Sequence, residues 1–246
     1  MRLLHLYHDL MNLYGDWANI KAIGLELAAR GAVPSIDCIS VGGEIDFGKY
    51  DFVYIGSGTE RSQKACIRDI MRCKAELKEK IEAGLHILAT GNAHEIFGNS
   101  ITDAQGERHE ALGLLDFETI QNESRVTGDC VCRASFLPDR LIGFINRSGH
   151  GQEGAIDRPF TCELGPGAND SSKAEGILLN NLLGTYMTGP VLVRNPPLLK
   201  YIADALYPGS ARVSSDGDVF FKYQEAAYSI ALQELSTRHR RVGVRS

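Results

Sequence analysis

Short apolar runs that end in glycine-rich turns alternate with helical segments in the first hundred residues, and this pattern most constrains the fold. The runs are short enough to be buried strands, and they cover residues 2–7, 33–41, 52–55 and 85–89. Periodic segments between them, at residues 20–28 and 62–83, predict helices. Strands that alternate with helices of this length form parallel sheets covered on both faces. The sequence therefore predicts an α/β fold with a central, mostly parallel sheet flanked by helices.

The middle of the chain has a different pattern. Short strand-like segments with few helical signals between them cover residues 117–120, 126–133 and 141–145. We expect these segments to form an antiparallel or mixed extension of the sheet.

The last quarter of the chain is expected to be mainly helical. Two prolines at residues 196–197 can start a helix at Leu198, and an amphipathic pattern predicts a last helix over residues 219–235. Residues 237–246 contain several basic side chains and are expected to form a solvated tail.

Composition excludes several classes of protein. The chain has 246 residues, of which 43% are hydrophobic and 23% charged, and its net charge is -5. These values predict one domain over residues 1–246 and no nucleic-acid partner. No apolar run approaches the ~18 residues that a membrane span needs, and the N-terminus becomes polar too early for a signal sequence, so we expect a cytoplasmic protein without membrane insertion. Six scattered cysteines lack zinc-site spacing and are expected to be free buried thiols, with no metal and no cofactor.

Functional residues are expected in the loops at the carboxyl ends of the parallel strands. After the strand at residues 52–55, Gly56 and Gly58 could present backbone N–H groups to an anion, or they could serve only the geometry of a tight turn. The segment at residues 88–98 has the outline of a nucleophile elbow, a sharp turn between a strand and a helix. Its apex carries no nucleophile, because Gly91 has no side chain and the Asn92 amide is a poor nucleophile.

Several strings in this order resemble the GatD-type proteins of the CobB/CobQ-like (cobyric-acid-synthase-like) class I glutamine amidotransferases. The first string is LYHDLMNLYGD at residues 6–16, and the second is GSGTERSQ at 56–63, similar to the family's GGGxDxxQ. The others are LATGNAHEIFG at 88–98, NESRVTGD at 122–129, GFINRSG at 143–149 and GTYMTGP at 184–190. The resemblance covers residues 4–206 and implies the flavodoxin-like fold of class I glutamine amidotransferases.

The resemblance also implies the positions of the catalytic residues. The family's elbow reads approximately A-x-C-G-G-Y-Q-L-L-G, which places the nucleophilic cysteine at Gly91. Its GTYLHGP string places the catalytic histidine at Thr188. Glutamine hydrolysis needs a thiolate, a histidine that moves its proton, and backbone donors for the oxyanion. Two of these three are missing, so the enzyme activity of this chain is uncertain and we expect it to be inactive toward glutamine.

Other positions of the resemblance are candidates for ligand binding: Gly56, Gly58, Asn92, His94, Glu95, Arg125, Asn146 and Ser148. His94 and Glu95 could bind a ligand at the old site, or could be exposed residues of the first helical turn. Arg125 could hold a substrate carboxylate or form a surface ion pair. A displaced cysteine, Cys130 or Cys132, is an unfavoured source of a substitute nucleophile.

Three functions follow from the resemblance. The first is a catalytically degenerate subunit of a heterodimer with MurT, a Mur-ligase-like ATP-dependent partner that amidates the lipid II stem peptide of peptidoglycan. The second is an active glutaminase subunit that supplies ammonia to that ligase. The third is a sensor that binds glutamine or another amino acid.

Overall fold

The computed structural model describes residues 1–151, 154, 156–213 and 218–243, with only the backbone course for 218 and 238–243. Its first sheet contains β1 (Arg2–Leu6), β2 (Ser35–Ile39), β3 (Phe52–Ile55), β4 (His86–Thr90), β11 (Ile177–Leu179) and β12 (Leu182–Thr185). Its second sheet contains β5 (Ser100–Thr102), β6 (Arg108–Glu110), β7 (Glu118–Ala134), β8 (Arg140–Gly151), β9 (Phe160–Leu164) and β10 (Ala174–Glu175). The α-helices are α1 (Trp17–Ala29), α2 (Glu60–Ile70), α3 (Lys74–Glu82), α4 (Val191–Arg194), α5 (Pro196–Leu206) and α6 (Asp218–Gly243). The 3₁₀ helices of the described residues are η1 (Phe47–Lys49), η2 (Met71–Cys73) and η3 (Gly91–Phe97).

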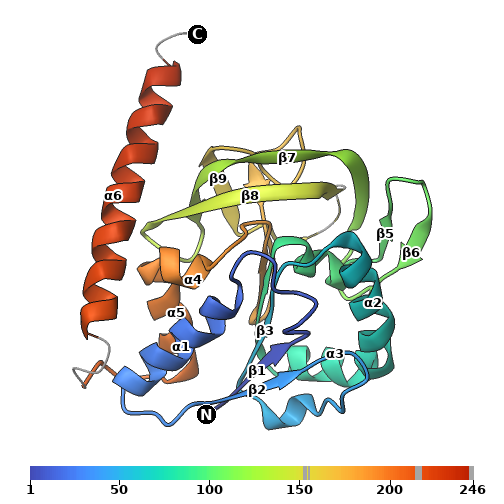
Figure 1. The fold of residues 1–246 in the computed structure, drawn as a ribbon, viewed down its shortest axis with the longest axis horizontal. Helices are drawn as coiled ribbons and strands as arrows, with labels where there is room; N and C mark the ends of the chain where they lie inside the picture. Colours follow the sequence, from blue (N-terminus) through green and yellow to red (C-terminus); the bar gives the residue numbers. More distant parts are fainter. Residues whose placement is uncertain (152–153, 155, 214–217, 244–246) are drawn as a thin grey trace.

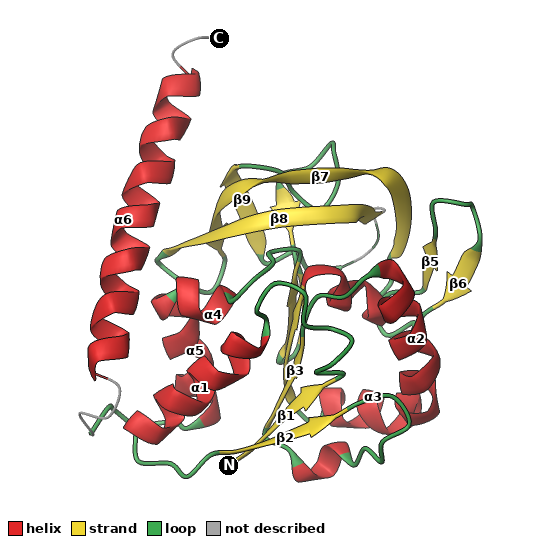
Figure 2. Ribbon diagram, in the orientation of Figure 1, coloured by secondary structure: helices red, strands yellow, loops and turns green. Residues whose placement is uncertain are grey.

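The first sheet is the predicted parallel core. Its strand order is β11-β12-β4-β3-β1-β2, and every neighbouring pair is parallel except β11 with β12. Helices α1, α4 and α5 lie on one face of this sheet, and α2 and α3 lie on the other (Figures 1 and 2). The expected α/β fold with helices on both faces is confirmed.

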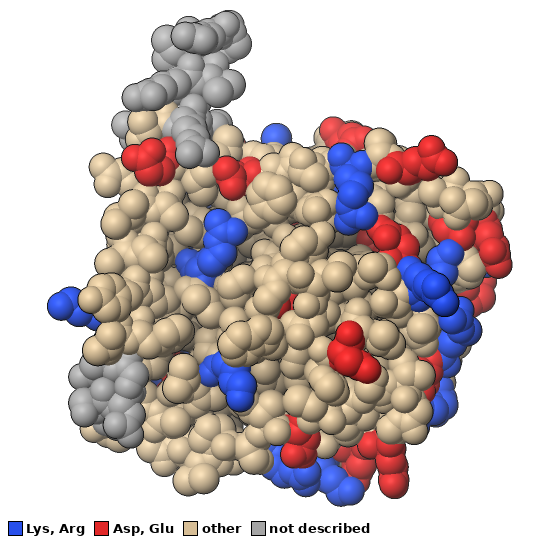
Figure 3. All heavy atoms as spheres, viewed as in Figure 1, with Lys and Arg blue, Asp and Glu red and all other residues tan. Residues whose placement is uncertain are grey.

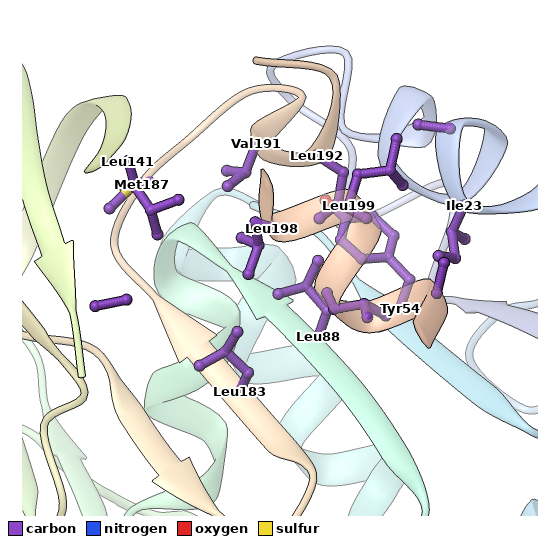
Figure 4. Packing of buried hydrophobic residues seen from close by; sticks show 14 of the residues in the cluster. Ile23, Tyr54, Leu88, Leu141, Leu183, Met187, Val191, Leu192, Leu198 and Leu199 are labelled. Carbon is purple, nitrogen blue, oxygen red and sulfur yellow. The ribbon is translucent and has the colours of Figure 1, made fainter. Parts of the chain in front are cut away.

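Two apolar cores hold these layers together. One includes Leu88, Leu183 and Tyr54 of the sheet, packed against α1 and α5 (Figure 4). The other lies beneath α2 and α3 and includes Val53, Ile67 and other fully buried aliphatic side chains. Burial of this apolar surface is the main force that fixes the helices on the sheet.

The expected antiparallel and mixed part forms a second sheet beside the first. Strand β7 pairs antiparallel with β8 and β9 and parallel with β5. Figure 1 shows β7 and β8 lying across the end of the first sheet at which β1 and β3 finish. An isolated bridge between Ile145 and Met187 joins the two sheets next to that end. Strands β7 and β8 therefore cover the loops in which functional residues were expected.

The predicted helix over residues 62–83 is interrupted. Helix α2 ends at Ile70, the 3₁₀ turn η2 follows, and α3 begins at Lys74. Ile70, Cys73 and Leu77 are all buried, so the tighter turn keeps one continuous face of the segment against the sheet.

The last helix is longer than the sequence pattern predicted. Helix α6 continues from Asp218 to Gly243, and most of the expected tail over residues 237–246 is therefore helical in its backbone. Residues 219–242 contain no proline or glycine, so nothing in them ends a helix. Residues 244–246 lie outside the described part of the chain. In Figure 1 the end of α6 extends beyond the body of the molecule.

The expectation of free thiols is wrong for two of the six cysteines. Cys132 on β7 and Cys162 on β9 face each other in the strand register and form a disulfide. Cys66, Cys73 and Cys130 are buried free thiols, and Cys38 is an exposed one. Sequence spacing missed the pair because the two residues become neighbours only through strand pairing.

The structure also shows how charged side chains are distributed on the surface and how apolar the helices are. Basic and acidic side chains are interspersed on the face shown in Figure 3. Within the part of the chain that the structure describes, no helix is both long and apolar enough to span a bilayer.

Leu88 tests the packing of the central strand. Its side chain is fully buried in the core of β4, α1 and α5. The Leu88→Ala variant is expected to lower the free energy of unfolding by about 2–5 kcal/mol, because truncation leaves a cavity that the close-packed neighbours cannot fill. Urea denaturation measures this loss. The control is Leu25→Ala on α1, where the side chain is 44% exposed. Equal losses of unfolding free energy in the two variants would contradict the burial of Leu88 in this core.

Candidate functional site

The turn after β4 keeps the shape of a nucleophile elbow. Gly91 follows the strand directly and has φ +60°, in the left-handed region that costs other residues energy. Its N–H donates to the Met187 carbonyl (3.2 Å), and its own carbonyl contacts the Nδ1 of His94 (2.7 Å). The segment after it is the 3₁₀ helix η3 rather than an α-helix. The elbow is therefore built, with glycine at its apex.

Ser57 fills the space that a side chain at the apex would need. Strands β3 and β4 are parallel neighbours with Ile55 opposite Ala89, and Ser57 and Gly91 each follow that pair by two residues. An ideal Cβ on Gly91 would lie 2.1 Å from Oγ of Ser57 and 2.8 Å from its Cβ. Real Cβ atoms do not approach other atoms this closely, so any side chain at this turn requires Ser57 to move.

The two glycines on either side of Ser57 allow the loop that contains Met11 to pack closely against this turn. A Cβ on Gly56 would lie 2.5 Å from the Met11 carbonyl oxygen, and one on Gly58 would lie 2.3 Å from Met11 Sδ. Neither glycine has a positive φ. The turn-geometry interpretation therefore gave the wrong physical reason, since it is packing of the Met11 loop that excludes side chains here.

Two backbone N–H groups of this loop already donate hydrogen bonds to side chains of the protein. The Ser57 N–H donates to Oδ2 of the buried Asp16 at 2.8 Å. The Gly58 N–H donates to Oδ1 of Asn92 at 3.0 Å, and Nδ2 of Asn92 donates to the Gly58 carbonyl at 3.0 Å. Burial raises the pKa of Asp16 to about 6, against the bonds that favour its charged form. The Gly58 N–H, one of the two expected anion-binding donors, is therefore already satisfied within the protein, as is the neighbouring N–H of Ser57.

Thr188 lies beside the elbow, because it follows the Met187 carbonyl that accepts the Gly91 N–H. Its hydroxyl donates to the Phe144 carbonyl at 3.0 Å, and its N–H donates to the same oxygen at 2.8 Å. The resemblance placed Gly91 and Thr188 together, and they are neighbours. A threonine hydroxyl cannot act as a general base near neutral pH.

Glu95 is buried, which contradicts the alternative of an exposed first-turn residue. Three protein groups donate to its carboxylate: Gln63 (2.7 Å), Tyr186 (3.0 Å) and Gln121 (3.2 Å). Burial is the largest influence and raises the pKa of Glu95 to about 7, while these hydrogen bonds act in the opposite direction. The segment folds inward because the second sheet covers η3.

His94 is also buried rather than exposed. Its ring packs edge-on against Tyr186, with 4.1 Å between the ring centroids, and burial lowers its pKa to about 3. The imidazole is therefore neutral at physiological pH. It supports the elbow through the Gly91 carbonyl.

Arg125, Asn146 and Ser148 form a second group of predicted residues. The Arg125 guanidinium pairs with Glu60 at 2.7 Å and donates to the Asn146 side chain at 2.6 Å, and Ser148 Oγ donates to Glu60 at 2.7 Å. These contacts agree with the ion-pair interpretation of Arg125. Arg125, Glu60 and Ser148 line a polar cleft of about 390 Å³ that also reaches Gln121, a partner of Glu95.

Neither cysteine of β7 supplies a nucleophile. Cys132 is bonded to Cys162, and Cys130 is fully buried in the hydrophobic core with Met187. Burial raises the pKa of the Cys130 thiol, which keeps it protonated.

One group of described side chains has the composition of a metal site. Asp103, Glu107 and His109 each offer a ligand atom, and these atoms lie within 4.8 Å of one another. The Lys64 ammonium already pairs with Asp103 at 2.5 Å and opposes a cation there. Asp103 and Lys64 also line the cleft of Glu60, Arg125 and Ser148.

Sequence reasoning missed several residues of the site. Ser57, Gln63 and Tyr186 lie inside the quoted strings, and only their spatial roles were unrecognised. Glu175 had no such signal: it is fully buried, it accepts hydrogen bonds from the Tyr186 N–H and the Thr185 hydroxyl, and burial raises its pKa to about 7.

Known proteins share this architecture and sequence. Residues 2–196 match the CobB/CobQ-like glutamine amidotransferase domain. The chain belongs to this family. It is 32% identical over 206 residues to the lipid II isoglutaminyl synthase (glutamine-hydrolyzing) subunit GatD of Staphylococcus aureus, covering 83% of each chain. It is 28% identical over 200 residues to the subunit of the same name from Streptococcus pneumoniae, covering 80% of this chain and 77% of that protein.

Solved structures support the same fold. A crystal structure of a glutamine amidotransferase superposes with a TM-score of 0.54 at 13% identity, covering 82% of this chain and 97% of that chain. A glutamine amidotransferase from Thermotoga maritima superposes with a TM-score of 0.52 at 14% identity, covering 97% of each chain. This CobB/CobQ-like chain therefore has the class I glutamine amidotransferase fold.

Glu95 gives the amidotransferase fold a testable pH dependence. Its pKa rises from 4.5 to about 7 on folding, so the folded state holds a proton that the unfolded state releases in this range. Stability from Glu95 is present below pH 4.5 and is lost as pH rises to 7, by roughly 3 kcal/mol. The Glu95→Gln variant is expected to show a smaller decrease in unfolding free energy between these pH values than the native chain.

Urea denaturation at a series of pH values measures the two slopes. Glu175 adds a decrease of the same sign to both proteins, so only their difference reports Glu95. The matched control is Glu79→Gln, an exposed carboxylate on α3. Parallel curves for native chain and Glu95→Gln would show that Glu95 does not titrate in this range.

Proposed function

We propose that this chain is a catalytically degenerate GatD-like subunit, which keeps the amidotransferase fold but does not hydrolyse glutamine. The contact between Gly91 and Ser57 carries this proposal. By the resemblance, the family has cysteine at the elbow apex and glycine at the middle residue of the glycine loop, where this chain has Gly91 and Ser57. In this chain the sizes of the two residues are reversed. Gly91 at the apex has no side chain, and the Ser57 side chain occupies the space that a side chain at the apex would need.

The chemistry of the site supports the same conclusion. A thiolate, a base and free oxyanion donors are all needed for acyl transfer from glutamine. Gly91 and Thr188 provide neither of the first two, and the Gly58 N–H is bonded to Asn92. Loss of one catalytic group costs about 10⁴-fold in rate, and loss of a second that acts with it costs little more.

The proposed role is to stabilise or regulate a ligase partner. The relatives are subunits of lipid II isoglutaminyl synthase. By resemblance, the partner is a MurT-like, ATP-dependent Mur ligase that amidates the glutamate of the lipid II stem peptide. With this subunit bound, such a ligase would take free ammonia rather than ammonia from glutamine.

The decisive assay is release of ammonia from glutamine by the purified chain, alone and with a co-expressed MurT-like ligase. No release above the enzyme-free blank is expected, because the thiolate and its base are missing. The Staphylococcus aureus relative, named as glutamine-hydrolyzing, is the positive control. Ammonia release by the native chain would contradict the proposal, whether or not thiol alkylation abolishes that release.

The partner role has its own test. The co-purified complex is expected to amidate lipid II with ATP and ammonium chloride, and to gain nothing when glutamine replaces ammonium. Omission of this chain should lower the yield or stability of the ligase. A complex that works as well with glutamine as with ammonium would be an active amidotransferase, and the alternative of a glutaminase subunit would be correct.

A further inference from the structure

The carboxamide of Asn92 makes a two-point contact with the backbone of Gly58. Its Oδ1 accepts the Gly58 N–H at 3.0 Å, and its Nδ2 donates to the Gly58 carbonyl at 3.0 Å. The two Gly58 groups fix the orientation of the amide, because an N–H must face the oxygen and a carbonyl must face the NH₂ group. This two-point contact places an amide carbonyl on a backbone donor next to the elbow apex.

The same residue is fixed from its backbone side. Nε2 of Gln63 donates to the Asn92 carbonyl at 2.7 Å and to Glu95 at 2.7 Å. Asn92 therefore links the glycine loop after β3, the elbow after β4 and the buried carboxylate of η3. A loose surface amide would have no such set of partners.

We propose that the Asn92 side chain is a built-in ligand of the former glutamine site. It occupies the place at the Gly58 backbone that a glutamine carboxamide would take. It also holds the glycine loop and the elbow together when no substrate is present. This inference deepens the proposed function and rests on it for the identity of the site. It implies that glutamine neither binds at the elbow nor regulates the chain, so any bound partner meets the same surface at all glutamine concentrations.

Thermal unfolding with L-glutamine tests the proposal. The native chain is expected to show no rise in Tm, because the carboxamide position is filled. The Asn92→Gly variant is expected to lose stability without ligand and to regain about 3 °C or more at saturating glutamine, since a ligand that binds only the folded state stabilises it. Asn92→Ala serves as the second variant in case the added glycine prevents folding.

Asn181 provides a matched control. Its Nδ2 donates to the Gly84 carbonyl at 2.8 Å, a bond of the same kind at the other end of β4. The Asn181→Ala variant is expected to lose some stability and to show no response to glutamine. A glutamine-dependent rise in Tm of the native chain, or no rise in either Asn92 variant, would overturn the proposal.

A second measurement uses catalysis. The Ser57→Gly/Gly91→Cys/Thr188→His chain is compared with the same chain carrying Asn92→Gly in addition. Freeing the Gly58 donor is expected to raise the rate of ammonia release from glutamine by about 10²-fold, the usual effect of one oxyanion donor. Equal rates in the two chains, including zero in both, would contradict the role of Asn92.

The two proposals fail in different ways. Ammonia release by the native chain would overturn the degenerate-subunit function. Glutamine binding by the native chain without ammonia release would overturn only the built-in ligand.

Discussion

The arrangement of the site depends on one steric fit, between the side chain of Ser57 and the missing side chain of Gly91. Parallel pairing of β3 with β4 places the two residues opposite each other at the carboxyl ends of adjacent strands. The positive φ of Gly91 keeps the sharp elbow, and the absence of its Cβ lets the glycine loop approach. A side chain at residue 91 would therefore require Ser57 to move.

The surrounding groups extend this fit into a closed polar network. Asn92 bonds the glycine loop, Gln63 joins Asn92 to Glu95, and Tyr186 packs on His94 and donates to Glu95. Buried polar groups are tolerated only when they are hydrogen-bonded, and this network meets that condition at most of its atoms. These hydrogen bonds fix the relative positions of the glycine loop, the elbow and η3.

Local patterns predicted the fold more successfully than the site. Residues 52–55 were assigned as a strand with the observed bounds, because a short β-branched and aromatic run before glycine has few alternatives. The burial of Glu95 could not be foreseen, because it requires the second sheet to lie over η3. The contact of Ser57 with Gly91 and the pairing of Cys132 with Cys162 both depend on strand register, which is not visible in a single sequence. The family strings identified the candidate residues. They did not identify the side chains that fill the space between those residues.

A double-mutant cycle on Ser57 and Gly91 tests the central steric claim most directly. Gly91→Ala is made in the native chain and in the Ser57→Gly chain, and the free energy of unfolding is measured by urea denaturation. Strain from the positive φ is the same in both backgrounds and cancels, so the difference reports the clash with Ser57. The structure predicts that Gly91→Ala costs about 1–3 kcal/mol more in the native chain than in the Ser57→Gly chain. Equal losses in the two backgrounds would show that Ser57 does not occupy the space of a side chain at the elbow.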